Sequence, residues 1–184
     1  SGAKMSYVAG VMVIGALALA AIVVATPYRL QRVVGFLDPS SNPLGAGYHI
    51  NQAQIAIGAG ETFGVGYGKS TTKINYLPEP IGDSIFAVVA EELGFVGAVG
   101  LIGVFMVLVL RILLLARKTK DKFGKLVLIG FGIIIGLQVF INIGAISGIL
   151  PLTGVPLPFI SYGGTALAVF MTMGGIVTNI SRYS

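Results

Sequence analysis

The sequence is poor in the residues on which several classes of function depend. It contains no cysteine, which excludes a disulfide framework and a thiolate metal site. Its single histidine, His49, excludes a histidine-rich metal site, and tryptophan is absent. Only 10% of its 184 residues are charged, far fewer than the surface of a soluble domain requires. The chain therefore lacks the composition of a soluble enzyme domain.

Apolar residues dominate what is present. They make up 55% of the chain, and the mean hydropathy is +0.92. A helix of about 20 apolar residues crosses the hydrocarbon core of a bilayer. Four stretches are long enough to do so, at residues 7–26, 84–115, 126–150 and 163–181. We predict an all-α polytopic membrane protein, a single membrane domain over residues 1–184 with about four transmembrane helices.

The formal net charge of +5 is explained by membrane topology. Five basic residues stand between the second and third predicted spans: Arg117, Lys118, Lys120, Lys122 and Lys125. Short basic loops remain in the cytoplasm. Both ends of the chain are then cytoplasmic, while residues 27–83 and the turn at 151–161 are extracytoplasmic. We expect no nucleic-acid partner.

The first residues are Ser1-Gly2-Ala3-Lys4, without an initiator Met or a signal-peptide pattern. We expect a part of a longer protein, whose further helices complete any site, and an isolated chain that is inactive.

The predicted extracytoplasmic loop is the part of the chain where chemistry is expected. Loops of this length are functional or disordered, and aromatic residues spread along it argue against disorder. Within it, residues 48–57 predict a short helix, either interfacial or re-entrant. Irregular backbone at membrane depth is tolerated only where protein or water covers it.

A glycine-rich run, Gly58-Ala59-Gly60-Glu61-Thr62-Phe63-Gly64-Val65-Gly66-Tyr67-Gly68-Lys69-Ser70, follows this helix. A nucleotide-binding P-loop would need glycine at Phe63, and a dinucleotide fingerprint would need glycine at Lys69. Both motifs are therefore excluded. We expect the glycines to allow close backbone approach to a ligand or to a neighbouring helix.

Charged residues of the loop are candidates for binding an anion such as a lipid pyrophosphate. The basic ones are Arg29, Arg32, Lys69 and Lys73, and the acidic ones include Glu79. Arginine and lysine suit phosphate oxygens. Any one of these side chains could equally well lie on a solvated surface without binding a ligand.

Asp83 closes the loop immediately before the second predicted span. Its carboxylate could cap that helix, act as a general base, or do both. Glu91 and Glu92 follow about two turns later, at a depth where carboxylates are costly unless they are paired or face a cavity. Because adjacent helical residues point about 100° apart, we expect only one of the two to face the interior.

Several motifs in fixed order carry a resemblance to a known family. They are Pro43-Leu44-Gly45-Ala46-Gly47-Tyr48-His49-Ile50, Leu77-Pro78-Glu79-Pro80-Ile81-Gly82-Asp83-Ser84-Ile85-Phe86, Glu91-Glu92-Leu93-Gly94, Gly148-Ile149-Leu150-Pro151 and Gly154-Val155-Pro156-Leu157-Pro158-Phe159-Ile160-Ser161-Tyr162-Gly163-Gly164. Over essentially its whole length the chain resembles the SEDS family (shape, elongation, division and sporulation), as the last four spans of a fold of about ten helices. Residues 80–83 and 159–167 are most similar to its division and sporulation branches, with the elongation branch next.

This resemblance implies a peptidoglycan glycosyltransferase. Family members join lipid II units into glycan strands at the outer face of the bacterial cytoplasmic membrane and release undecaprenyl pyrophosphate. They work beside a class B penicillin-binding protein, a transpeptidase, among other divisome or elongasome membrane proteins. The resemblance places the catalytic general base on Asp83, with Arg29, Arg32, Lys73, Glu79, Glu91 and Glu92 as candidate substrate-binding residues. The basic residues would neutralise the pyrophosphate, alone or with a divalent cation such as Mg²⁺.

The surroundings of Asp83 depart from those of many relatives. Ile81-Gly82 replaces His-Thr, Asn75 stands where some relatives have a carboxylate, and Thr153 where some have lysine.

Two other functions suit the same features. A lipid II transporter would also use broken helices and intramembrane carboxylates, and a scaffold could activate a transpeptidase without catalysis. Transport and scaffolding would each survive loss of the Asp83 carboxylate, whereas polymerisation would not.

Overall fold

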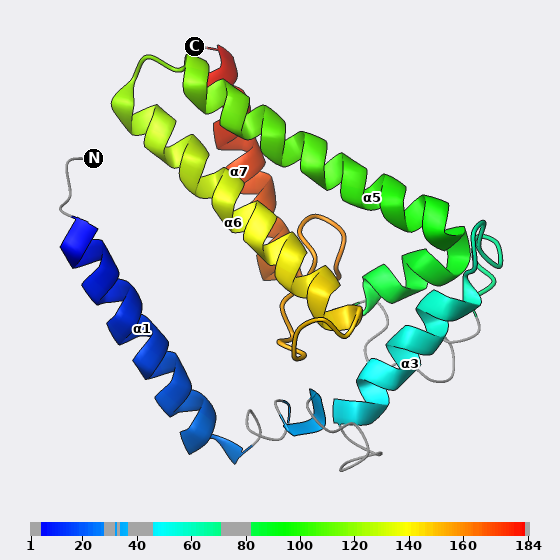
Figure 1. The fold of residues 1–184 in the computed structure, drawn as a ribbon. Helices are drawn as coiled ribbons and strands as arrows, with labels where there is room; N and C mark the ends of the chain where they lie inside the picture. The colour runs from blue at the N-terminus through cyan, green and yellow to red at the C-terminus, as the bar shows by residue number, and fades with distance from the viewer. Residues whose placement is uncertain (1–4, 28–31, 33, 37–45, 71–81, 183–184) are drawn as a thin grey trace. The chain divides into compact units, whose positions relative to one another are not determined.

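The computed structural model describes residues 5–27, 32, 34–36, 46–70 and 82–182. In order, its helices are α1 (Met5–Ala25), α3 (Ala46–Ala59), α5 (Ile85–Lys118), α6 (Lys122–Ile146) and α7 (Gly164–Arg182), shown in Figure 1. No strand occurs among these residues, as the all-α prediction requires. The chain divides into two compact units, Ser1–Tyr48 and His49–Ser184.

The first unit contains α1, a helix without a charged residue. It is not amphipathic, because apolar side chains lie on all its sides, and the residues whose burial is described are exposed. A helix that is apolar all round belongs inside a membrane or a large core.

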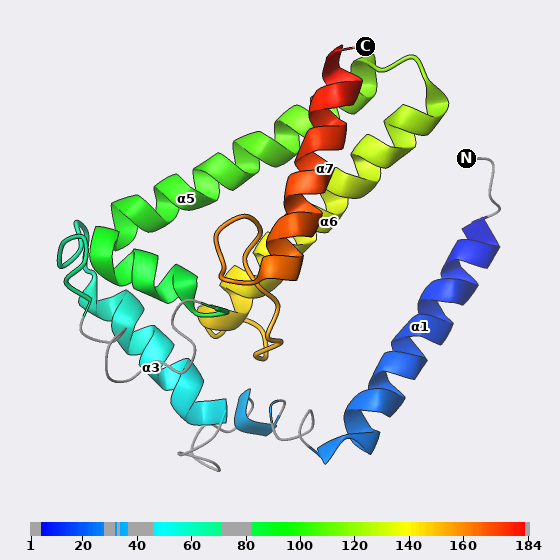
Figure 2. The ribbon, with the colours of Figure 1, turned by 180° about the vertical axis from the view of Figure 1, so that it is seen from behind.

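Three helices of the second unit, α5, α6 and α7, are long and apolar enough to cross a membrane. The hydrophobic core that joins them includes Phe105, Leu128 and Phe170, one from each helix. Figure 2 shows α7 lying against α6. A second core cluster joins α3, the start of α5 and the end of α6 through residues such as Ala53, Phe86 and Ile146.

The ends of α6 are set by local backbone chemistry. Its N-cap is Asp121, whose carboxylate accepts a hydrogen bond of 2.7 Å from the Gly124 N–H. The helix ends at Ile146, before the predicted end of the span at residue 150. Gly148 there takes a left-handed φ of 76°, and the N–H groups of Ile149 and Leu150 turn back to the Gly144 carbonyl.

The most consequential feature is a break in α5 at Gly94, where φ is 68° and ψ is −167°. Figures 1 and 2 both show the helix changing direction sharply beside the glycine-rich loop. Residues 95–118 alone extend over about 36 Å, more than the roughly 30 Å of a hydrocarbon core. The segment before the break is therefore not needed for crossing the membrane and can turn back toward the other helices.

The glycine-rich loop fills this break with main-chain hydrogen bonds. Four bonds of 2.9–3.2 Å join Val65 N–H to Glu91 C=O, Gly66 N–H to Glu92 C=O, Phe95 N–H to Glu61 C=O and Val96 N–H to Thr62 C=O. The carbonyls of Glu91 and Glu92 and the N–H groups of Phe95 and Val96 would otherwise lack a partner, because the break removes their hydrogen bonds within the helix. The prediction that the glycines allow close approach to a neighbouring helix is thus confirmed.

Only glycine fits at the contact between the loop and the break. A Cβ at Gly94 would overlap the Gly64 nitrogen, and a Cβ at Gly64 would overlap the Glu92 carbonyl oxygen. Both residues also have left-handed φ values, 68° and 82°. The φ and ψ of Gly94 together lie in a region that side chains essentially never adopt.

Gly94→Ala is therefore expected to destabilise the protein by roughly 3 kcal/mol or more, from backbone strain and overlap combined. The matched control is Gly103→Ala in the same helix, where an added Cβ meets nothing within 4 Å. That change should be neutral or stabilising by up to about 1 kcal/mol. Thermal unfolding in detergent measures both, and equal midpoints for the two variants would contradict the close-contact account.

Candidate functional site

Asp83 lies in the turn that leads into α5, at the end of the segment that turns back from the break. It is half-buried, so part of its surface remains accessible. The N-cap of α5 is the next residue, Ser84, whose side chain makes no capping bond. The N-cap position considered for Asp83 is therefore taken by Ser84.

Asn142 of α6 fixes the backbone at Asp83. Its side-chain amide donates one hydrogen bond of 3.0 Å to the Asp83 carbonyl and another of 2.7 Å to the Val155 carbonyl. The side chain is only 2% exposed. It therefore joins the start of α5 and the turn after α6 to the same point on α6.

Asn142 is not among the site residues predicted from the sequence. The available signal was an amide within an apolar span, since polar groups at membrane depth are rare and tend to be functional.

The turn after α6 is held by further polar contacts. Gln138 donates a hydrogen bond of 3.2 Å to the Pro156 carbonyl. The buried Leu157 donates its N–H to the Ser161 hydroxyl at 2.7 Å. Phe159 packs on Phe170 of α7, with ring centroids 5.5 Å apart. The family-like motif at residues 154–164 thus folds back over the end of α6 and onto α7.

His49 approaches from α3. Its Nε2 lies 3.5 Å from the hydroxyl of the fully buried Ser84, a long contact that nevertheless places the imidazole beside the residue after Asp83. His49 is not among the site residues predicted from the sequence, although it belongs to the family-like motif at residues 43–50. Three separated segments therefore meet around residues 83 and 84: α3, α6 and the turn that α6 holds.

Glu91 and Glu92 are both buried, with 1% and 7% of their surfaces exposed. The expectation that only one would face the interior was wrong, because the glycine-rich loop covers the side of α5 that an isolated helix would expose. Ser70, also buried, donates a hydrogen bond of 2.5 Å to Glu91 Oε2. Both glutamates directly precede the break, where their carbonyls also accept the loop's N–H groups.

Of the other predicted binding residues, the structure describes only Arg32. Arg32 is half-buried and belongs to the first unit, whereas Asp83, Glu91 and Glu92 belong to the second. Arg29, Lys73 and Glu79 lie outside the described residues.

The described residues do not fit a divalent cation as a resident cofactor. No group of three His, Asp or Glu side chains among them is close enough together to hold a metal ion. We therefore derive no catalytic step through a metal.

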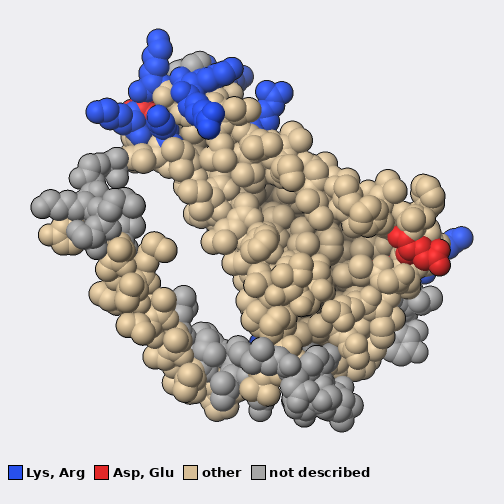
Figure 3. Space-filling model, in the orientation of Figure 1, with Lys and Arg blue, Asp and Glu red and all other residues tan. Residues whose placement is uncertain are grey.

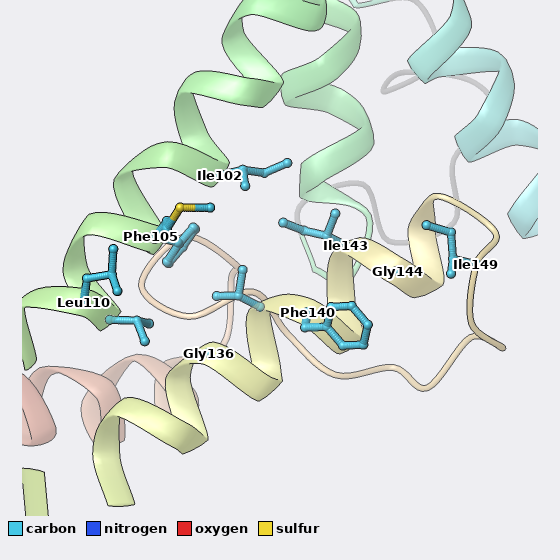
Figure 4. Close-up of a pocket in the computed structure, with 11 residues that line it drawn as sticks. Ile102, Phe105, Leu110, Gly136, Phe140, Ile143, Gly144 and Ile149 are labelled. Atoms are coloured by element: carbon cyan, nitrogen blue, oxygen red, sulfur yellow. The ribbon is translucent and has the colours of Figure 1, made fainter. Parts of the chain in front are cut away.

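An apolar hollow of about 400 Å³ lies between α5 and α6, as Figure 4 shows. Its lining includes Phe105, Phe140 and Ile143 and contributes no charged side chain. It has no group for acid–base chemistry, in contrast to the region of Asp83.

The model of the family described as "Cell cycle protein", covering FtsW, RodA and SpoVE, matches residues 1–184. The chain belongs to this family. Stage V sporulation protein E of Bacillus subtilis is 41% identical over all of the chain and 50% of its own length. Peptidoglycan glycosyltransferase MrdB of Escherichia coli is 48% identical over 85% of the chain and 42% of its own length. A probable peptidoglycan glycosyltransferase FtsW of Geobacter is 37% identical over 98% and 49%.

Solved structures support the same membership in the FtsW/RodA/SpoVE family. A chain from a study of polymerisation and crosslinking by a peptidoglycan synthase complex matches with a TM-score of 0.70 and 34% identity, over 93% of this chain and 48% of its own. The rod shape determining protein RodA of Thermus thermophilus matches with a TM-score of 0.53 and 40% identity, over 55% and 34%. The chain spans about half the length of the curated relatives it matches.

Asn142→Leu is expected to destabilise this family member by about 1–3 kcal/mol, because two carbonyls lose their donor. Hydrogen exchange at the amides of residues 85–88 should also accelerate. The matched control is Gln138→Leu, one turn earlier on α6, which loses a bond to the turn but none to Asp83. If both variants accelerate exchange at the start of α5 equally, Asn142 does not anchor Asp83.

Proposed function

We propose that the protein containing this chain is a peptidoglycan glycosyltransferase that polymerises lipid II at the outer face of the bacterial cytoplasmic membrane. The setting that residues 159–167 favour is cell division. Family membership and relatives named peptidoglycan glycosyltransferase support the activity. The observation that carries it is the position of Asp83, half-buried at the start of a broken helix whose backbone Asn142 holds.

In this proposal the Asp83 carboxylate accepts the proton of an acceptor sugar hydroxyl. The hydroxyl oxygen attacks the anomeric carbon of the donor as the bond to undecaprenyl pyrophosphate breaks. A single displacement inverts the centre, so an α-linked pyrophosphate gives a β-linked glycan. A base on an anchored backbone suits this step, because the gain from a general base depends on its holding hydrogen-bond reach of the proton.

The leaving pyrophosphate carries charge that has to be neutralised. Arg29, Arg32 and Lys73 are the proposed partners, since preorganised positive charge is often the largest catalytic contribution. Glu79, Glu91 and Glu92 are proposed to shape the binding region. The buried hydrogen bond from Ser70 to Glu91 supports a role for Glu91 in holding the loop against α5.

We also propose a class B penicillin-binding protein as partner, together with other membrane proteins of the division or elongation machinery. Lipid II and undecaprenyl-linked glycan are the proposed substrates. Support for the transpeptidase comes from the similar solved structure, which belongs to a peptidoglycan synthase complex that coordinates polymerisation and crosslinking.

Asp83→Asn in the full-length protein should lower lipid II polymerisation by about 10²-fold or more, the contribution of a general base. Gel analysis of fluorescent glycan chains measures it. The control is Asp121→Asn, which removes one carboxylate at the N-cap of α6, where asparagine caps as well as aspartate. Normal glycan chains from the Asp83→Asn protein would contradict the proposal. If the Asp83→Asn protein still translocates lipid II, a transporter would then be favoured. If it still activates the transpeptidase, a scaffold would be favoured.

The proposed orientation places the glycine-rich loop outside the cell and the connection from α5 to α6 inside. It is supported by the basic residues of that connection. Tyr67 and Lys120 are both exposed, and this chain contributes no native thiol. Tyr67→Cys should react with a membrane-impermeant maleimide in intact cells, and Lys120→Cys only after permeabilisation. The reverse pattern would invert the topology and remove Asp83 from the outer face.

A further inference from the structure

A second hollow, of about 490 Å³, lies between α5 and α7 at the end of the molecule opposite the break. Its walls are leucine, isoleucine and valine side chains of the two helices. Its polar lining consists of Arg111 and Lys118 from α5 and Thr178 and Ser181 from α7. Apolar walls joined to two cations are the features expected of a site for an amphipathic anion.

Charge at this end of the molecule is strongly one-sided. Residues 95–182 contain seven lysines and arginines and one acidic residue, Asp121. Figure 3 shows the basic side chains gathered where α5 and α6 connect. The Asp121 carboxylate accepts the N–H of Gly124 and so caps α6. The sequence of these helices offers no other carboxylate to balance Arg111 and Lys118.

The two cations lie on the same side of α5, where their long side chains can reach one anion. They are seven residues apart, so they share one face and are separated by about 10 Å along the axis. Arg111 lies within a helix long and apolar enough to cross the membrane. A cation at such a depth is costly unless it reaches the interface or an anion.

The hydroxyls of α7 add a hydrogen-bond donor. Thr178 already donates its hydroxyl to the Gly174 carbonyl at 2.9 Å. Ser181, one turn further along α7, is exposed and lines the same hollow. The polar side of the hollow can thus supply two charged donors and one neutral donor, a set that suits phosphate oxygens.

We propose that this hollow binds an anionic phospholipid from the membrane leaflet that lies at the same end of the molecule as these basic residues. Arg111, Lys118 and Ser181 hold the headgroup phosphate, and the acyl chains lie against the apolar walls. Basic pockets between transmembrane helices are established as sites of this chemical class. A free phosphate would use the cations but leave the apolar walls uncovered, which is why the proposal commits to a lipid.

The test compares the purified full-length protein in nanodiscs of phosphatidylglycerol with the same protein in phosphatidylcholine. Phosphatidylglycerol should raise the thermal unfolding midpoint, and native mass spectrometry should detect retained lipid. The double variant Arg111→Gln/Lys118→Gln should weaken retention by about tenfold or more. The matched control Arg117→Gln/Lys122→Gln removes the same charge from residues that do not line the hollow, and should retain the lipid.

The other outcomes overturn the proposal. Equal losses in the two double variants would mean that total charge and not this hollow binds the lipid. Stabilisation of the detergent-solubilised protein by inorganic phosphate to the same extent would mean that no lipid is needed. No phosphatidylglycerol effect in the unmodified protein would mean that the hollow is closed, for example by another segment of the full-length chain.

Folding of the variants is controlled within the same experiment. An unchanged midpoint in phosphatidylcholine shows that Arg111→Gln/Lys118→Gln is folded. Should it fail to fold, Lys118→Gln alone, at the last residue of α5, should still reduce retention. The charge-preserving variant Arg111→Lys should keep most of the lipid retention. Full retention by Lys118→Gln would contradict the assignment.

Discussion

The second unit depends on one requirement, that every main-chain N–H and C=O exposed by the break in α5 find a partner. Residues 61–66 meet it by exchanging four hydrogen bonds with the helix on both sides of Gly94. Three glycines allow that contact, because a Cβ at Gly60, Gly64 or Gly94 would overlap the opposing backbone. The loop is therefore a structural part of the helix to which it is bound.

The position of the candidate base follows from this break. A continuous α5 would carry its first residues on past the membrane, about 51 Å from its last residue for 34 residues. The broken helix instead returns to the bundle, where Asn142 can reach the Asp83 carbonyl. Because Asn142 also holds Val155, the start of α5 and the turn after α6 are linked. A displacement of either element should therefore also displace the backbone at Asp83.

The two ends of the helical bundle are chemically different. At the broken end, buried carboxylates, an imidazole and an amide lie close to main-chain groups, an arrangement that suits proton transfer and precise positioning. At the other end, lysines and arginines are gathered, and two of them, Arg111 and Lys118, line a hollow with apolar walls. This arrangement suits anchoring in a charged leaflet. Between them, the segments of α5, α6 and α7 present apolar side chains, as a lipid environment requires.

Composition and apolar length alone determined the all-α membrane class, since few charges and long apolar stretches admit no soluble fold. The ordered motifs alone determined the family and Asp83 as the candidate base, and the glycine spacing excluded a nucleotide site. Only the tertiary structure decided that Gly94 breaks α5, that both glutamates are buried, that the N-cap position falls on Ser84 and that Asn142 holds Asp83. The physical reason is that periodicity and composition are local. The partners that satisfy a broken helix or a buried amide come from segments distant in the chain, which are known only when the chain is folded.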